Sequence, residues 1–74
     1  GPQGTGVIKS IDVGNHKMVI IHNPIAELGW PKMTMEFVVD PSVDLSSVHD
    51  GDKIKFTLKA KGDEDYSIIN LQKD

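Results

Sequence analysis

Residues 53–60 alternate strictly between polar and apolar side chains. The apolar positions Ile54, Phe56 and Leu58 share one face of an extended chain, because successive side chains of a β-strand point to opposite sides. Lysine and threonine occupy the other face. A helix repeats its apolar residues every three to four positions, so this segment predicts a strand with one buried face and not an amphipathic helix. The rest of the chain must supply a sheet that covers this face.

Four other segments have strand patterns and are separated by turn-forming residues: 6–12, 17–22, 32–39 and 66–71. The first alternates imperfectly, which predicts a β-bulge, and the second is apolar on both faces, which predicts a central strand. Residues 41–50 form a polar connection that could hold one helical turn. Five short strands without a convincing helix predict an all-β fold, namely a small five-stranded Greek-key barrel of the OB-fold type.

The chain has 74 residues, which is enough for one domain with a small core. We expect residues 6–74 to form that domain and residues 1–5 to be a disordered tail, in which Gly1-Pro2 is typical of a cloning scar left by protease cleavage. The absence of cysteine excludes disulfides and thiolate metal ligands. No apolar run approaches the roughly 20 residues of a membrane helix, so direct membrane insertion is not expected.

Two methionines and a histidine indicate a site for a soft metal ion. Met33 and Met35 are two residues apart, so in a strand both sulfur atoms project from one face and could touch a single cation. Thioether sulfur is a poor ligand for hard cations but a good ligand for Cu(I), and imidazole is acceptable to the same ion. His22 ends the preceding apolar strand, and the intervening loop is short enough to bring it near Met33. These three residues are the candidate ligands.

The only tryptophan, Trp30, lies in that intervening loop. It precedes Pro31, and a proline biases the residue before it to an extended conformation. The indole is thereby expected to stay near the methionines, and its face is the best side-chain partner for a cation. Trp30 is therefore the candidate cover of the ion.

Each of these residues also has a simpler interpretation. Met33 and Met35 could be flexible core filler, and Trp30 could be ordinary packing. His22 could be a hydrogen-bonded structural histidine. Their occurrence together within fourteen residues favours a metal site, because a core does not need an imidazole, two thioethers and an indole at one loop. Met18 has no such neighbours in sequence and is expected in the core. The remaining histidines lie in predicted turns and are expected to be solvent-exposed: His16 and His49.

The same stretch resembles the CusF family of small periplasmic proteins that bind copper and silver in heavy-metal efflux systems, and the similar C-terminal domain of some periplasmic adaptor proteins. The family motif is H-D-P-I-A followed by W-P-x-M-T-M-x-F, with the histidine eight residues before the tryptophan, as here. The matching residues are His22, Asn23, Pro24, Ile25, Ala26, Trp30, Pro31, Met33, Thr34, Met35 and Phe37. Asn23 departs from the commoner aspartate, and Gly29 replaces a larger polar residue, but neither is a ligand in the family. The match extends more weakly over residues 6–71.

The resemblance implies an OB barrel that binds one Cu(I) or Ag(I) ion per domain. His22, Met33 and Met35 would be the ligands, and Trp30 would cover the ion through a cation-π contact. The resemblance further implies a metallochaperone or adaptor domain in the periplasm, which delivers the ion to the periplasmic components of a tripartite heavy-metal efflux system and so supports metal resistance. We expect the isolated domain to be a monomer.

An OB barrel could instead bind single-stranded nucleic acid or serve as a protein interaction module. Four aromatic residues, the absence of arginine and a net charge of -3 argue against nucleic acid. Catalysis is not expected either, because no pair of nucleophile and base stands out, and a site filled by Met, Met and His leaves no position for an activated water.

Overall fold

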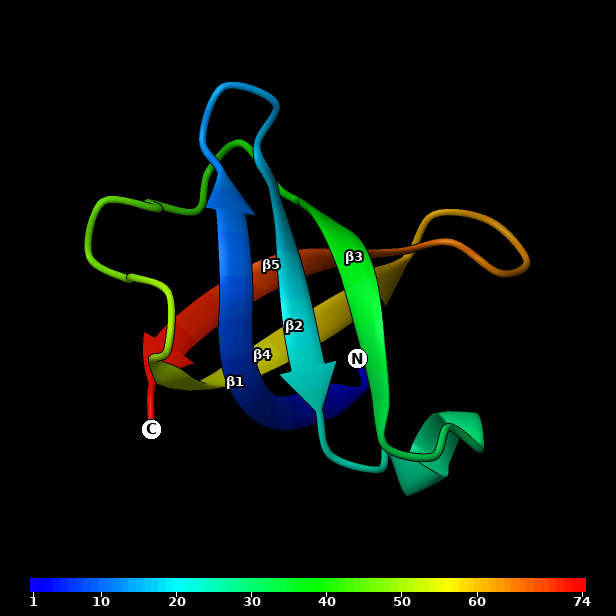
Figure 1. Ribbon diagram of the computed structural model, residues 1–74. Coiled ribbons are helices and arrows are strands. Elements are labelled where there is room, and N and C mark those ends of the chain that lie inside the picture. Colours follow the sequence, from blue (N-terminus) through cyan, green and yellow to red (C-terminus); the bar gives the residue numbers. More distant parts are fainter.

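The computed structural model describes all 74 residues and contains five strands and one short 3₁₀ turn. The elements are β1 (Gln3–Asp12), β2 (Lys17–His22), η1 (Ala26–Leu28), β3 (Met33–Val39), β4 (Lys53–Ala60) and β5 (Tyr66–Lys73). They form a closed barrel in the order β1-β2-β3-β5-β4, in which only β3 and β5 run parallel (Figure 1). The predicted all-β, five-stranded barrel is confirmed, and β2 and β4 have the predicted bounds.

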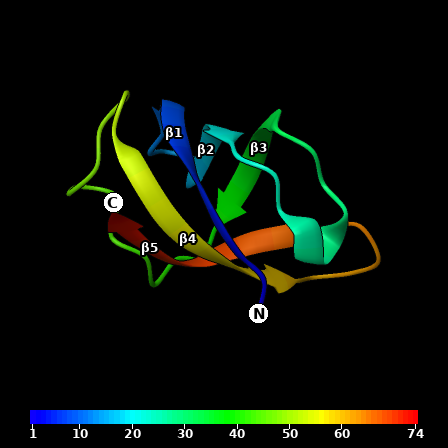
Figure 2. The same ribbon diagram turned by 90° about the horizontal axis from the view of Figure 1, so that it is seen from below.

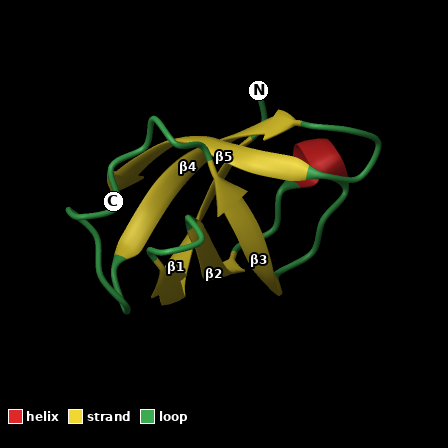
Figure 3. Cartoon of the chain, turned by 90° about the horizontal axis from the view of Figure 1, so that it is seen from above, coloured by secondary structure: helices red, strands yellow, loops and turns green.

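Strand β1 joins the two layers of the barrel. Figure 3 shows β1, β2 and β3 side by side, with β4 and β5 crossing them. Residues 6–12 of β1 pair with β2, and residues 3–7 pair with β4. The register with β2 shifts between Ile8 and Ser10, so Lys9 is an extra residue and the predicted bulge is confirmed. A bulge increases the local twist of a strand, which allows β1 to turn from one layer into the other.

Strand β1 begins earlier than the sequence pattern indicated. Residues 3–5 pair with residues 55–57 of β4, so the prediction of a disordered tail is wrong for these three residues. Their sequence, Gln-Gly-Thr, has no apolar side chain and therefore no strand pattern. The pairing satisfies backbone groups of β4 that would otherwise lack partners on that side.

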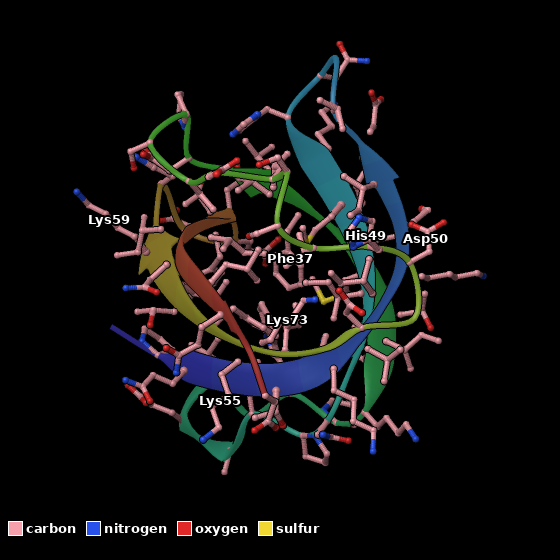
Figure 4. All side chains as sticks on the ribbon, turned by 90° about the vertical axis from the view of Figure 1, so that its left-hand side faces the viewer. Phe37, His49, Asp50, Lys55, Lys59 and Lys73 are labelled. Carbon is pink, nitrogen blue, oxygen red and sulfur yellow. The ribbon has the colours of Figure 1, made fainter.

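Apolar side chains from all five strands fill the barrel. The buried hydrophobic residues are Ile8, Met18, Ile20, Ile25, Phe37, Val39, Leu45, Val48, Ile54, Phe56, Leu58 and Ile68. Phe37 points into the barrel, whereas Lys55 and Lys59 project from its outer surface (Figure 4). The predicted inward face of β4 and the predicted core position of Met18 are therefore confirmed.

The connection between β3 and β4 contains turns and no helix, so the helical turn considered for residues 41–50 does not form. Leu45 and Val48 anchor this connection in the core. The helical segment η1 is three residues long, and no helix of the structure has the length and apolarity to cross a membrane.

His16 has a structural role that the sequence did not reveal. It was predicted to be solvent-exposed, but its ring is half-buried, and Nε2 lies 3.1 Å from the carbonyl oxygen of Asp40 and 3.2 Å from that of Val43. Carbonyl oxygens only accept hydrogen bonds, so Nε2 carries the proton and donates. His16 thus ties the β1–β2 turn to the β3–β4 connection, because the fold brings two distant turns together. His49 is exposed as predicted.

Three aspartates accept hydrogen bonds from residues two or three positions ahead: Asp12 from Asn15, Asp40 from Ser42 and Asp44 from Ser46. The side-chain bonds first, and then the backbone bonds, lower the pKa of each carboxyl from its ordinary value of 3.8. The unfolded chain therefore takes up protons at higher pH than the folded chain does. These carboxylates stabilise the fold above about pH 4, and their contribution is lost as the pH falls through the lowered pKa values.

We expect the free energy of unfolding, measured by urea titration, to decrease as the pH falls from about 4 to about 2. The matched control is a variant with all three aspartates replaced, namely Asp12→Asn, Asp40→Asn and Asp44→Asn. This variant should lose less stability over the same range. An equal loss in both proteins would show that other groups cause the acid sensitivity.

Candidate metal centre

His22 is the last residue of β2 and is completely buried, with 0% of its surface exposed. It continues the inward-facing row that begins with Met18 and Ile20. Met33 lies directly opposite His22 in the register of β2 and β3, and Met35 lies opposite Ile20. Directly opposite residues share a face and have Cβ atoms about 5 Å apart. His22, Met33 and Met35 therefore face the same side of the sheet at one end of the barrel.

The two methionines differ in exposure. Met35 is half-buried and packs against the core, whereas Met33, the first residue of β3, is 36% exposed. The side chains predicted to face the interior from β3 do so, but their burial increases along the strand. Met33 is exposed at the rim, Met35 is half-buried and Phe37 is buried in the core. The rim position makes one thioether accessible to an ion that arrives from solvent.

The contacts of the His22 ring decide which nitrogen carries the proton. Nδ1 lies 2.8 Å from the carbonyl oxygen of Asn23, and Nε2 lies 3.3 Å from Sδ of Met35. The carbonyl only accepts, so Nδ1 is protonated and donates, and in the neutral ring Nε2 has a free lone pair. A thioether sulfur has no proton to donate either. Two lone-pair atoms thus face each other, an arrangement that a shared cation would stabilise.

Asn23 orients the imidazole and ties the loop to β1. Its backbone N–H donates to the carbonyl oxygen of Thr5 at 2.9 Å, and its side-chain Nδ2 donates to Oγ1 of Thr5 at 2.8 Å. The contact with the His22 ring uses the main-chain carbonyl of Asn23, so it does not require a particular side chain there. Sequence reasoning assigned no role to Asn23, because a main-chain contact leaves no residue-type signal.

Trp30 is held in place by the loop between β2 and β3. Its N–H donates to the carbonyl oxygen of Ile25 at 3.1 Å, and its carbonyl accepts from the N–H of Ile25 at 2.9 Å. These two hydrogen bonds close the loop around η1. The 3₁₀ turn ends at Gly29, whose φ of 68° is a left-handed conformation that suits glycine. Ile25 is buried in the core, so the backbone of Trp30 is fixed to the barrel.

The Trp30 indole lies among other aromatic rings. Its centroid is 5.6 Å from that of the His22 imidazole and 6.3 Å from that of the Phe37 ring. The Tyr66 ring packs edge-on against the indole at 5.3 Å and 89°, a favourable aromatic geometry. The indole therefore stands beside the imidazole. Tyr66 was missed, since nothing in its local sequence links it to a loop on another part of the chain.

The family model described as "Copper binding periplasmic protein CusF" matches residues 1–73 of the chain. The chain belongs to the CusF family. The cation efflux system protein CusF of Escherichia coli (strain K12) is 43% identical over 58 residues, which cover 78% of this chain and 53% of that protein. The corresponding protein of Escherichia coli O157:H7 is 41% identical over 58 residues, which cover the same 78% of this chain and 53% of that protein. This CusF-family chain thus spans about half the length of the curated relatives it matches.

Solved structures of CusF share the fold. The Ag(I)-bound protein from Escherichia coli has a TM-score of 0.88 and 34% identity, and the match covers 99% of this chain and 90% of that chain. The apo form has a TM-score of 0.87 and 33% identity, with 99% and 86% covered. The C-terminal domain of SilB from Cupriavidus metallidurans, at 24% identity, has the same fold with a TM-score of 0.84 over 97% of this chain and 85% of that domain.

The candidate donor atoms in this CusF-family chain differ from those of most metal centres. No group of three or more His, Cys, Asp or Glu side chains lies together in the structure. The candidate site instead combines the imidazole of His22 with the thioethers of Met33 and Met35. This set has no net charge while the histidine is neutral, and its sulfur atoms suit soft ions such as Cu(I) and Ag(I).

Proposed function

We propose that this domain binds one Cu(I) or Ag(I) ion through Nε2 of His22 and the sulfur atoms of Met33 and Met35, with Trp30 covering the ion. The observation that carries this proposal is the contact of 3.3 Å between Nε2 of His22 and Sδ of Met35. No proton lies between these two atoms when the neutral ring is protonated at Nδ1, the nitrogen that donates to the carbonyl oxygen of Asn23. The family supports it, because a relative with 34% identity has been solved with Ag(I) bound.

We further propose that the domain is a carrier in the periplasm and not an enzyme, and that it acts as a monomer. It would deliver the ion to the periplasmic components of a tripartite heavy-metal efflux system, as a metallochaperone or as the metal-presenting domain of an adaptor. The names of its relatives support this role, since they are cation efflux system proteins. Neutral thioethers exchange readily, so such a site suits transfer better than storage.

The structure does not favour single-stranded nucleic acid as an alternative ligand. A binding platform needs exposed aromatic rings, but Phe37 and Phe56 are each 2% exposed. Trp30 and Tyr66 pack against each other. The net charge of -3 would also repel phosphate groups.

Titration of the apo domain with Ag(I), followed by the fluorescence of Trp30, tests the proposed function. We expect quenching that saturates at one ion per chain, because the ion would lie against the indole. Zn(II), which prefers anionic or harder ligands, should leave the fluorescence unchanged, as should a single-stranded oligonucleotide. Tight Zn(II) binding without Ag(I) binding would refute the proposal.

Replacement of Trp30 tests its role as the cover of the ion. Contact with an indole face stabilises a bound cation by about 0.5 to 2 kcal/mol. The ring would also shield the ion from water and oxidants. We expect Trp30→Met to bind Cu(I) at least as tightly as the wild type, because the new thioether becomes a fourth ligand. Trp30→Ala should still bind Cu(I), but the bound ion should oxidise faster in air. A relative with an alanine in place of a tryptophan has been solved with Cu(II).

X-ray absorption at the copper edge measures the coordination number of the Trp30→Met variant, and a timed oxidation assay in air measures the protection lost in Trp30→Ala. Wild-type results in both measurements would mean that the indole packs against the barrel without touching the ion.

A further inference from the structure

Strand β3 has a partner along only part of one edge. It pairs with β2 over residues 33–38, but it pairs with β5 only at Val38 and Val39. Figure 1 shows the reason, since β5 passes behind β3 at an angle and the two strands separate toward the start of β3. Residues 33–37 therefore have a neighbouring strand on one side and none on the other.

The backbone groups of two residues face this open side. The N–H of Val39 donates to the carbonyl oxygen of His16, on the β2 side of the strand, at 2.9 Å. Hydrogen-bonding groups alternate between the two edges of a strand, so those of Thr34 and Glu36 point away from β2. These donors and acceptors form a short row that can pair with another extended chain.

A cleft of about 430 Å³ lies beside residues 35–38 of β3, so it adjoins the open edge at Met35, Glu36 and Phe37. One wall is β3, and the other is the start of β5 with the turn that precedes it, which projects from the barrel on the same side as η1 (Figures 1 and 2). Trp30 and Met35 form part of the lining, so the cleft adjoins the candidate metal centre. Its acidic lining residues are Glu36, Glu64 and Asp65, and its only basic lining residue is Lys61.

We propose that this cleft binds an extended, lysine- or arginine-rich segment of a partner protein, which adds as a strand to the open edge of β3. Main-chain hydrogen bonds to Thr34 and Glu36 provide the pairing, and the carboxylates of Glu36, Glu64 and Asp65 select a basic sequence. The same carboxylates disfavour nucleic acid and acidic peptides. A segment bound here lies against Trp30 and Met35. The proposal does not depend on a bound metal and stands or falls separately from metal binding.

The probe is a synthetic peptide of about eight residues, the length of an ordinary strand, with alternating lysine and threonine. Its controls are the same peptide with glutamate for lysine, and the lysine peptide with N-methyl groups that remove the N–H donors on one edge. In nuclear magnetic resonance titrations of the apo domain, we expect the lysine peptide to shift the amide signals of Thr34 and Glu36 and to slow their hydrogen exchange. Neither control peptide should do so.

The double variant Glu64→Lys with Asp65→Lys tests the charge contribution. Both residues are exposed in a turn, so the fold should persist, and the affinity for the lysine peptide should fall by at least about tenfold. Asp50→Lys, an exposed position that does not line the cleft, is the matched control and should bind nearly as the wild type does. The proposal is overturned if the N-methylated peptide binds equally well, or if the double variant binds unchanged. It is also overturned if the Thr34 and Glu36 signals shift with protein concentration alone, because the edge would then pair with a second copy of the chain.

Discussion

Met33→Ile and Met35→Ile are each expected to abolish tight Ag(I) binding while the domain remains folded. Isoleucine has nearly the volume and apolar character of methionine, so each replacement should change the free energy of unfolding by less than about 1.5 kcal/mol. It removes the sulfur, however, and thereby one of the three proposed ligands. Loss of a group that merely supports a metal ligand typically weakens binding 10- to 100-fold, so loss of a ligand should weaken it by more than about 100-fold. Competitive titration with Ag(I) and urea unfolding measure the two effects.

Met18→Ile is the matched control for this pair. Met18 is the third methionine of the chain, and it is 1% exposed in the core on the inward face of β2. Its replacement should lower stability by a similar amount and leave the affinity for Ag(I) unchanged. If the variants at Met33 and Met35 bind silver as the wild type does, their thioethers contribute only packing and the proposed ligand set is wrong.

Gly6→Ala is expected to destabilise the fold more than any conservative change on the surface. Gly6 lies where β1 pairs with His22 of β2 on one side and Ile54 of β4 on the other. A Cβ at this position would lie 2.5 Å from the carbonyl oxygen of Ile21 and 2.8 Å from Cα of His22. Both contacts are to backbone, which cannot rotate away, so β1 and β2 must move apart.

Such overpacking typically costs about 1 to 3 kcal/mol, and a core of this size supplies only about 3 to 5 kcal/mol of net stability. We therefore expect Gly6→Ala to lower the midpoint of urea unfolding markedly. It should also weaken Ag(I) binding, because the displaced backbone carries His22. Gly14→Ala is the matched control. The nearest atom to a Cβ at this position would be Oδ1 of Asp12 at 3.7 Å, a normal van der Waals distance. A change within about 0.5 kcal/mol in Gly6→Ala would contradict the prediction.

The sequence predicted the strands whose side chains alternate. In β4 the pattern of Ile54, Phe56 and Leu58 defined both the strand and its buried face, because a pleated strand with one face in the core requires that period. The pattern failed at residues 3–5, which pair through their backbone without apolar side chains. It also failed for His16, whose partners are carbonyl oxygens of a distant turn.

The sequence also determined which side chains could serve a soft ion, because ligand softness is a property of residue type. It could place Met33 and Met35 on one face of a strand, and Trp30 near them. Only the tertiary structure decided that Nδ1 of His22 donates to a main-chain carbonyl and that Nε2 faces the sulfur of Met35. Likewise, only the barrel decided that β3 and β5 separate and leave an acidic cleft beside the site. Strand register, ring tautomers and the angle between strands arise from contacts between distant segments, and such contacts have no period along the chain.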